Sequence, residues 1–128
     1  MIDWKFANKL RPHNRKETFK HFMAKAMAFK ILFNAGYYVY SEYDMWGTNE
    51  DGERGLCKVS DVYAYEGLPW YKLPSKPIVV EIESNPTKKH NKELMEFHKD
   101  RTLYIIDLRK ISEDIVEMEK QIKHILGL

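Results

Sequence analysis

One short segment of the chain combines buried-strand character with acidic side chains. Residues 77–83 read Pro-Ile-Val-Val-Glu-Ile-Glu, so two acids end an otherwise apolar run. Side chains on a strand alternate between its two faces, so Glu81 and Glu83 share one face and Ile82 lies on the other. An apolar strand is expected inside a sheet, where an unpaired carboxylate is costly to bury. A divalent metal held by oxygen ligands is the most economical partner for these acids.

Length and composition favour one folded domain that spans residues 1–128. Hydrophobic residues make up 44% of the chain, which argues against a disordered protein. No apolar run approaches the roughly 20 residues of a membrane span, and the first residues do not resemble a signal peptide. Because Cys57 is the only cysteine, an internal disulfide is excluded. We therefore expect no membrane partner and a cytoplasmic location, in the host cell if the source is viral.

Charge is distributed unevenly, although the net charge of +2 does not by itself indicate nucleic-acid binding. Basic residues concentrate in residues 5–30 and 88–101, and acidic residues in 42–53 and 113–119. This asymmetry is compatible with basic surfaces around an acidic centre.

The hydrophobic periodicity predicts seven elements in the order αβββαβα. The first three strands can form an antiparallel meander. A helix between the third and fourth strands implies a parallel, right-handed crossover. The expected fold is therefore α/β, with a mixed four-stranded sheet flanked by helices. The first helix should follow Asn14 and the last should follow Ser112, since both residues suit a helix N-cap. The predicted ranges are 15–35, 37–43, 56–65, 77–83, 86–98, 102–108 and a last helix to about 125.

Asp61 is the second acidic residue that points to a site. It lies in the predicted strand 56–65, on a face that it shares with Val59 and Tyr63. If this strand pairs with residues 77–83, Asp61 can approach Glu81. Two carboxylates at such a position outline a divalent-metal site, to which a strand carbonyl can add a ligand.

This order of elements, with Asp61 followed twenty residues later by Glu81-Ile82-Glu83, resembles the PD-(D/E)xK nuclease superfamily. It looks like the archaeal and viral branch that includes Holliday junction resolvases. The resemblance covers roughly residues 15–110 and implies a restriction-endonuclease-like core. In that family the residues that match Asp61 and Glu81 bind Mg²⁺. The third motif position is usually Lys, and Glu83 in its place resembles a variant of some type II restriction endonucleases.

The predicted first helix carries Glu17, His21 and Lys25 at four-residue spacing, so they stack along one face. Members of the superfamily often place a helix Glu near the metal, which makes Glu17 a candidate. Glu42, at the end of the first strand, is another. Structural interpretations remain open as well. Glu17 has capping-box spacing from Asn14, and the other two fit a solvated face or an ion pair with Glu17.

Several lysines are candidates for contacts to nucleic acid or for the positive charge that the motif lysine would supply. Lys58 lies close to Asp61 in sequence, but it alternates onto the other face of the strand. The cluster on the second helix also fits an ordinary solvated face. The residues predicted to bind nucleic acid are Lys25, Lys58, Lys88, Lys89 and Lys92.

The expected site has a metal-binding part and a set of supporting acids. Mg²⁺ or Mn²⁺ is expected on Asp61, Glu81 and the carbonyl of Ile82. Glu83 is expected to position or deprotonate the attacking water, or to share a second metal. Further ligands or outer-shell residues are expected from Glu17 and Glu42.

The resulting prediction is a Mg-dependent deoxyribonuclease that hydrolyses phosphodiester bonds in DNA, with branched DNA among its candidate substrates. The resemblance also implies a homodimer. Two alternatives remain open. One is a catalytically inactive nucleic-acid-binding protein with the nuclease fold. The other is an unrelated α/β interaction module, which is favoured if Asp61 and Glu81 lie far apart.

Overall fold

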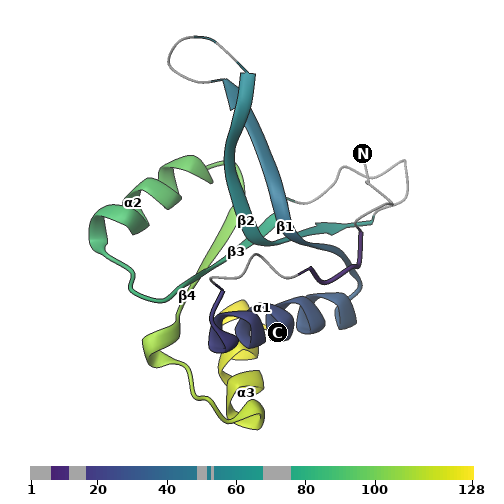
Figure 1. The fold of residues 1–128 in the computed structure, drawn as a ribbon. Helices are drawn as coiled ribbons and strands as arrows, with labels where there is room; N and C mark the ends of the chain where they lie inside the picture. The colour runs from purple at the N-terminus through teal and green to yellow at the C-terminus, as the bar shows by residue number, and fades with distance from the viewer. Residues whose placement is uncertain (1–6, 12–16, 49–51, 53, 68–75) are drawn as a thin grey trace.

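The computed structural model describes residues 7–11, 17–48, 52, 54–67 and 76–128, so Asn14, the predicted first cap, lies outside the described residues. The predicted α/β order αβββαβα is confirmed (Figure 1), with a short 3-10 turn added before the last helix. The elements are α1 (Phe19–Asn34), β1 (Tyr37–Thr48), β2 (Arg54–Glu66), β3 (Ile78–Glu83), α2 (Lys88–Phe97), β4 (Thr102–Asp107), η1 (Leu108–Lys110) and α3 (Ile115–Leu126).

The four strands form one mixed sheet in the order β1-β2-β3-β4. β1, β2 and β3 are antiparallel neighbours, and β3 is parallel to β4. The meander and the helical crossover were both predicted from the sequence. They follow from the short β1–β2 connection and from the helix that separates β3 from β4.

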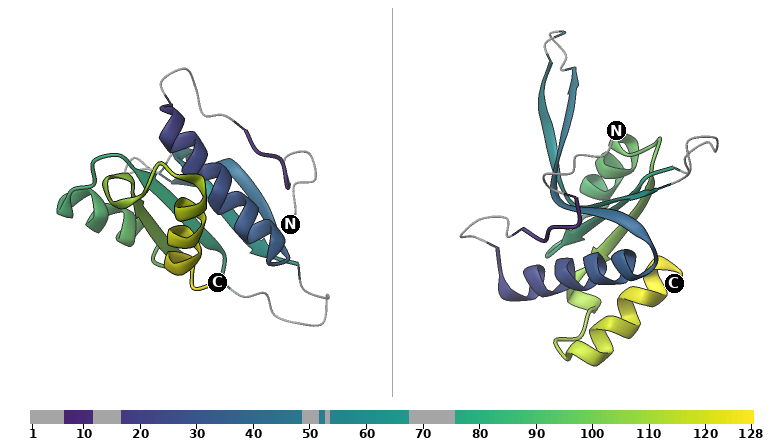
Figure 2. Two further views of the ribbon diagram at one scale, coloured as in Figure 1. Left: turned by 90° about the horizontal axis from the view of Figure 1, so that it is seen from below. Right: turned by 90° about the vertical axis from the view of Figure 1, so that its right-hand side faces the viewer.

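The apolar core lies on the sheet face that α1 and α3 cover (Figure 2). Alternate residues of the central strands, such as Val62, Val80 and Ile106, point into it and have no exposed surface. Leu32 of α1 and Ile122 of α3 pack against them. α2 lies apart from this core, and Leu94 is its only buried residue. The opposite face of the sheet is therefore less covered.

Helix starts differ from the predicted ones by a few residues because other side chains cap them. Thr18, Thr87 and Asp114 accept hydrogen bonds from backbone N–H groups in the first turns of α1, α2 and α3. The prediction of Ser112 as the last cap was wrong. Its hydroxyl instead accepts a hydrogen bond from the backbone N–H of Asp114.

The β1–β2 hairpin is longer than the sequence predicted. β1 continues to Thr48 and β2 begins at Arg54, whereas the predicted strands covered only residues 37–43 and 56–65. The distal part of this hairpin projects away from the helices (Figure 1). No helix in the described part of the chain is long and apolar enough to cross a lipid bilayer.

Candidate active site

Three acidic residues lie in one row across the sheet. The pair Val62–Val80 is the last regular contact of β2 with β3 on this side, which leaves Asp61 beside Glu81. On the other edge of β2, the pairs that flank Glu42 and Asp61 set these two residues opposite each other. The predicted proximity of Asp61 and Glu81 is thus found in the structure, and Glu42 joins the same row.

Where the backbone pairing between β2 and β3 stops, the carboxylates of Asp61 and Glu81 accept hydrogen bonds from backbone N–H groups of the opposite strand. The backbone N–H of Asp61 donates to Glu81 Oε1 at 3.1 Å, and that of Ile82 donates to Asp61 Oδ2 at 2.8 Å. In an extended strand the N–H and C=O of one residue point to the same side. The Ile82 carbonyl is therefore directed toward the same gap between the strands.

Glu81 is almost fully buried and has two basic neighbours. Lys58 Nζ lies 2.9 Å from Glu81 Oε2, and Nε2 of the buried His98 lies 3.9 Å from the same oxygen. Burial has the largest influence on the pKa of Glu81 and raises it. The His98 imidazole, the Lys58 ammonium and the backbone N–H of Asp61 together outweigh this influence, so the pKa of Glu81 lies below its ordinary value and Glu81 is ionised at neutral pH.

The contact of Lys58 corrects the expectation that this side chain points away from the acids. β2 is not a regular strand here, since the register of β1–β2 shifts after the Met45–Lys58 pair. β2 also no longer pairs with β3 at this level. A long side chain can therefore pass through the gap between the strands and reach Glu81, which strict alternation would not allow.

His21 of α1 bridges two carboxylates. Its Nδ1 lies 2.6 Å from Glu17 Oε2, and its Nε2 lies 3.4 Å from Asp61 Oδ1. The contact with Asp61 is the largest influence on the pKa of His21. Partial burial lowers that pKa, but Asp61 and Glu17 together raise it to about 9. The imidazole is therefore protonated at neutral pH.

Lys25 is fully buried and holds together Glu17, which lies just before α1, and Glu42 of β1. Its Nζ lies 2.9 Å from Glu17 Oε2 and 2.8 Å from Glu42 Oε1. Of the two structural interpretations, the ion pair with Glu17 is found for both His21 and Lys25, whereas the solvated face is not found for Lys25. A side chain without exposed surface also does not fit the predicted contact of Lys25 with nucleic acid. The spacing of Lys25 to the buried Ala28 and Leu32 was the signal for its burial.

Glu42 reaches Lys25 because the backbone of β1 is distorted. Its φ of 51° lies in the left-handed region, which costs a residue with a Cβ about 1–2 kcal/mol. Such conformations persist where surrounding contacts over-determine them, and they concentrate at functional sites. Here the distortion turns an acid in the middle of a strand toward α1.

Glu83 and the lysines of α2 lie outside this network. Glu83 Oε1 is 3.0 Å from Nε2 of the half-exposed His90. Within the described residues, this imidazole is the ion-pair partner of Glu83. The three predicted phosphate-binding lysines of α2 are exposed, and none of them forms an ion pair with a described residue. They are Lys88, Lys89 and Lys92.

The donor chemistry fits a hard cation, but cations of the protein already face the acids. Asp61 and Glu81 offer adjacent carboxylates, the oxygen ligands that Mg²⁺ prefers. The oxygens that do not accept backbone N–H groups face His21 and Lys58. Among the described residues, no three His, Cys, Asp or Glu side chains converge as a metal site would require. Further ligands would have to come from the backbone and from water.

Sequence reasoning missed His98, which lies at the end of α2 and next to Glu81. Its only signal was its position in the basic segment 88–101, because no metal-ligand spacing marks it. Comparison with protein-family models, curated proteins and solved structures finds no match to this chain.

Proposed function

We propose that this protein is a metal-dependent nuclease that hydrolyses phosphodiester bonds in DNA. The observation that carries the proposal is the adjacency of the Asp61 and Glu81 carboxylates where β2 and β3 separate. Glu42 in the same row, in a strained backbone conformation, supports it. The residues are those that the resemblance to PD-(D/E)xK nucleases implies.

The roles of the acidic residues follow from their surroundings. Asp61, Glu81 and the carbonyl of Ile82 would hold Mg²⁺ or Mn²⁺. A bound cation of this kind supplies charge neutralisation at the scissile phosphate and a water of lowered pKa. Glu83 would orient or deprotonate the attacking water, with His90 holding its carboxylate. Glu17 and Glu42 would not contact the metal directly. They would hold Lys25 and His21 in position through ion pairs, and His21 in turn contacts Asp61.

Lys58 would supply the positive charge that Glu83 cannot. Its ammonium is 2.9 Å from Glu81, and its side chain is 25% exposed, so it can reach both the centre and a bound phosphate. A fixed cation next to a phosphate undergoing substitution stabilises the charge that develops in the transition state. The lysine of the motif would thus be replaced by one from β2.

The DNA backbone would lie along the exposed face of α2. Lys88, Lys89 and Lys92 are exposed there, and His98, the neighbour of Glu81, follows directly after α2. Lysine contacts with phosphates give affinity that depends on salt and little on sequence.

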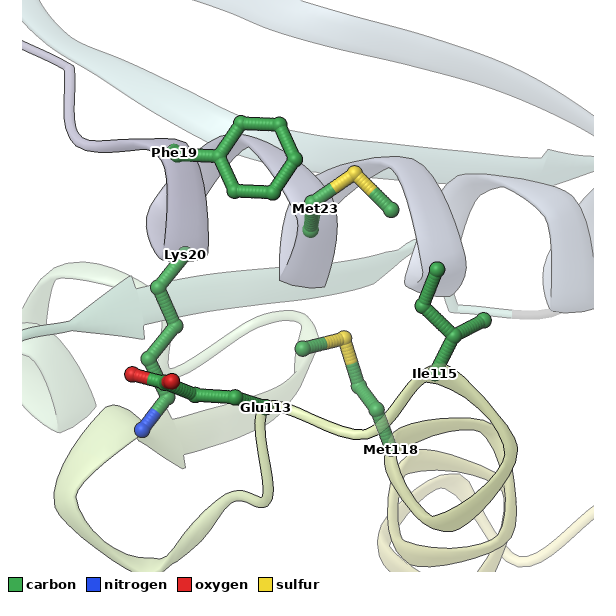
Figure 3. A pocket seen from close by; sticks show the side chains of 6 residues that line it. All are labelled: Phe19, Lys20, Met23, Glu113, Ile115 and Met118. Carbon is green, nitrogen blue, oxygen red and sulfur yellow. The ribbon is translucent and has the colours of Figure 1, made fainter.

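We further propose a homodimer that pairs through the groove between α1 and α3. Figure 3 shows this groove, whose apolar side chains Phe19, Met23, Ile115 and Met118 are joined by the charged Lys20 and Glu113. The volume of the cavity is about 280 Å³. Phe19 is 80% exposed, an unusual position for a large apolar ring. Sedimentation equilibrium should report a dimer for the wild type and a monomer for Phe19→Ser. A monomeric wild type at all accessible concentrations would contradict this arrangement.

A catalytically inactive nucleic-acid-binding protein is the second candidate. The observation that favours it is that each acid of the row already has a cationic partner. Lys25 pairs with Glu42, His21 with Asp61, and Lys58 with Glu81. Such a network is stable without a metal. Metal binding without cleavage would identify this class of protein.

Cleavage of labelled linear duplex, single-stranded and four-way-junction DNA with Mg²⁺, Mn²⁺ or EDTA tests the proposal. Wild-type protein should cut in a metal-dependent manner. Glu81→Gln should lose about 100-fold or more of this activity, the size of effect expected when transition-state charge loses its stabilisation.

Glu117→Gln on the exposed surface of α3 is the matched control, and it should cut like the wild type. If folded wild-type protein cuts none of the substrates with either metal, the nuclease proposal fails. If Glu81→Gln cuts as fast as the control, the acidic centre is not the active site.

A further inference from the structure

A second cavity lies between the end of α2 and β4. Its volume is about 360 Å³, and its walls are of two kinds. Met95, Leu103 and Ile105 form an apolar wall. His98, Lys99 and Arg101 form a basic one, and no acidic side chain of the described residues lines the cavity. A site with this lining suits a ligand that has a flat apolar part and a negative charge.

Arg101 is held in position while its charge remains available. Its Nη1 lies 3.2 Å from the carbonyl oxygen of Phe97 and 3.4 Å from His98 Nδ1. The guanidinium also lies over the Phe97 ring, 5.8 Å from the centroid. All these neighbours are uncharged groups or an imidazole, and within the described residues Arg101 has no carboxylate partner. A preorganised guanidinium of this kind binds phosphate strongly.

The cavity adjoins the acidic centre. Ile105 is the neighbour of Glu81 in the β3–β4 ladder, on the same face of the sheet. His98 belongs to the cavity wall and also lies 3.9 Å from Glu81 Oε2. Its side chain is fully buried, and Nε2 has no hydrogen-bond partner among the described residues. This nitrogen faces the Glu81 carboxylate, so one side chain belongs both to the cavity wall and to the surroundings of the acidic centre.

We propose that this cavity binds a single unpaired nucleotide next to the acidic centre. The base would pack on Met95, Leu103 and Ile105, and the phosphate would bind Arg101. This inference rests on the proposed function and deepens it, because it names the substrate. A base in the cavity cannot stay paired with its complement, so the preferred substrate contains single-stranded or unpaired DNA.

The test measures binding of a short single-stranded oligonucleotide in EDTA, so it does not depend on cleavage. Arg101→Gln should weaken binding by about tenfold, the effect of losing one charge-assisted contact with phosphate. Lys120→Gln on the exposed surface of α3 removes the same charge elsewhere and should weaken it by less than about twofold. Weakening of the same size in both variants would overturn the proposal.

A second pair of variants tests the same site independently, in case Arg101→Gln does not fold. Met95 is 63% exposed, so Met95→Glu adds a negative charge to the cavity wall without disturbing the core. It should also weaken binding by about tenfold, whereas Leu128→Glu at the exposed C-terminal end should not. Binding that neither Met95→Glu nor Arg101→Gln weakens would refute the subsite.

Two small probes separate a nucleotide site from a simple anion site. Deoxynucleoside monophosphates should shift the backbone amide resonances of residues 95–105 at concentrations where inorganic phosphate does not. Equal shifts with inorganic phosphate would mean that the apolar wall contributes nothing, and the absence of shifts would mean that the cavity is no site. Both results overturn the proposal.

The outcomes distinguish this inference from the proposed function. Arg101-dependent binding by a protein that cuts nothing would leave the nucleotide site standing and remove the nuclease activity. If Arg101→Gln and Met95→Glu change neither metal-dependent cutting nor oligonucleotide binding, the nuclease activity stands and the nucleotide site is refuted.

Discussion

His21 carries the charge that holds two carboxylates together at neutral pH. It lies between Glu17 and Asp61, whose negative charges raise its pKa to about 9. The positive charge of the imidazole offsets the repulsion between the carboxylates of Glu17 and Asp61, so both can remain ionised close to each other. The position of Asp61 therefore depends on the protonation state of a residue in another element.

The stability of the fold should depend on pH through His21. Because its pKa is about 9 in the folded protein and 6.5 when unperturbed, its contribution is complete below pH 6.5 and is lost as the pH rises through about 9. The unfolding free energy of wild type relative to His21→Gln, measured by chemical denaturation, should therefore be largest below pH 6.5 and decline toward pH 9. A difference that stays constant over this range would contradict the assigned ion pairs.

Individual residues of the site were predictable where regular strand geometry holds. Asp61 and Glu81 meet because two adjacent strands bring them to the same level, and the sequence indicated both strands. Lys58 was misjudged because alternation fails where β2 loses its partner. The left-handed backbone of Glu42 left no mark in the sequence, since only the surrounding contacts enforce it.

α1 is attached to the sheet by a buried ionic contact as well as by apolar packing. Lys25, on the sheet-facing side of the helix, reaches Glu42 of β1 and Glu17 just before the helix. A buried ion pair adds little net stability over an apolar contact, but removal of one partner leaves an uncompensated charge. The contact therefore matters chiefly for where α1 begins and how it meets β1.

Lys25→Met should destabilise the protein by about 3–5 kcal/mol, because two mostly buried carboxylates each lose a close ion pair. Lys30→Met, on the same helix, removes an ion pair with Glu119 whose lysine is 59% exposed, so it should cost less than about 1 kcal/mol. Urea denaturation of the three proteins measures both values. Equal losses for the two variants would show that Lys25 is not paired as described.

The elements themselves were largely predictable, and their ends were not. Apolar periodicity identified the three α-helices and the four strands of the described residues, because burial of one face dominates the choice of secondary structure. The helix ends depend on single hydrogen bonds, such as those that Thr18 and Asp114 accept, and several nearby residues can supply them. The length of β1 and β2 depends on pairing between them, which no local pattern specifies.

The molecule as a whole separates its core from its candidate site. α1 and α3 bury one face of the sheet, whereas α2 and the cavity at its end lie on the other face. The acidic centre lies between these two parts, at the gap between β2 and β3, and side chains reach it from α1 and from the end of α2. Because α2 buries only Leu94, it would be able to adjust to the proposed substrate without disturbing the core.

Binding of Mn²⁺ tests the central claim most directly, because it does not require the correct DNA substrate. Titration calorimetry at neutral pH should show saturable binding to the wild type. Asp61→Asn and Glu81→Gln should each weaken it by about tenfold or more, and Glu117→Gln should not. If folded wild-type protein binds no Mn²⁺ at millimolar concentration, or if all variants bind equally, Asp61 and Glu81 do not form a metal centre.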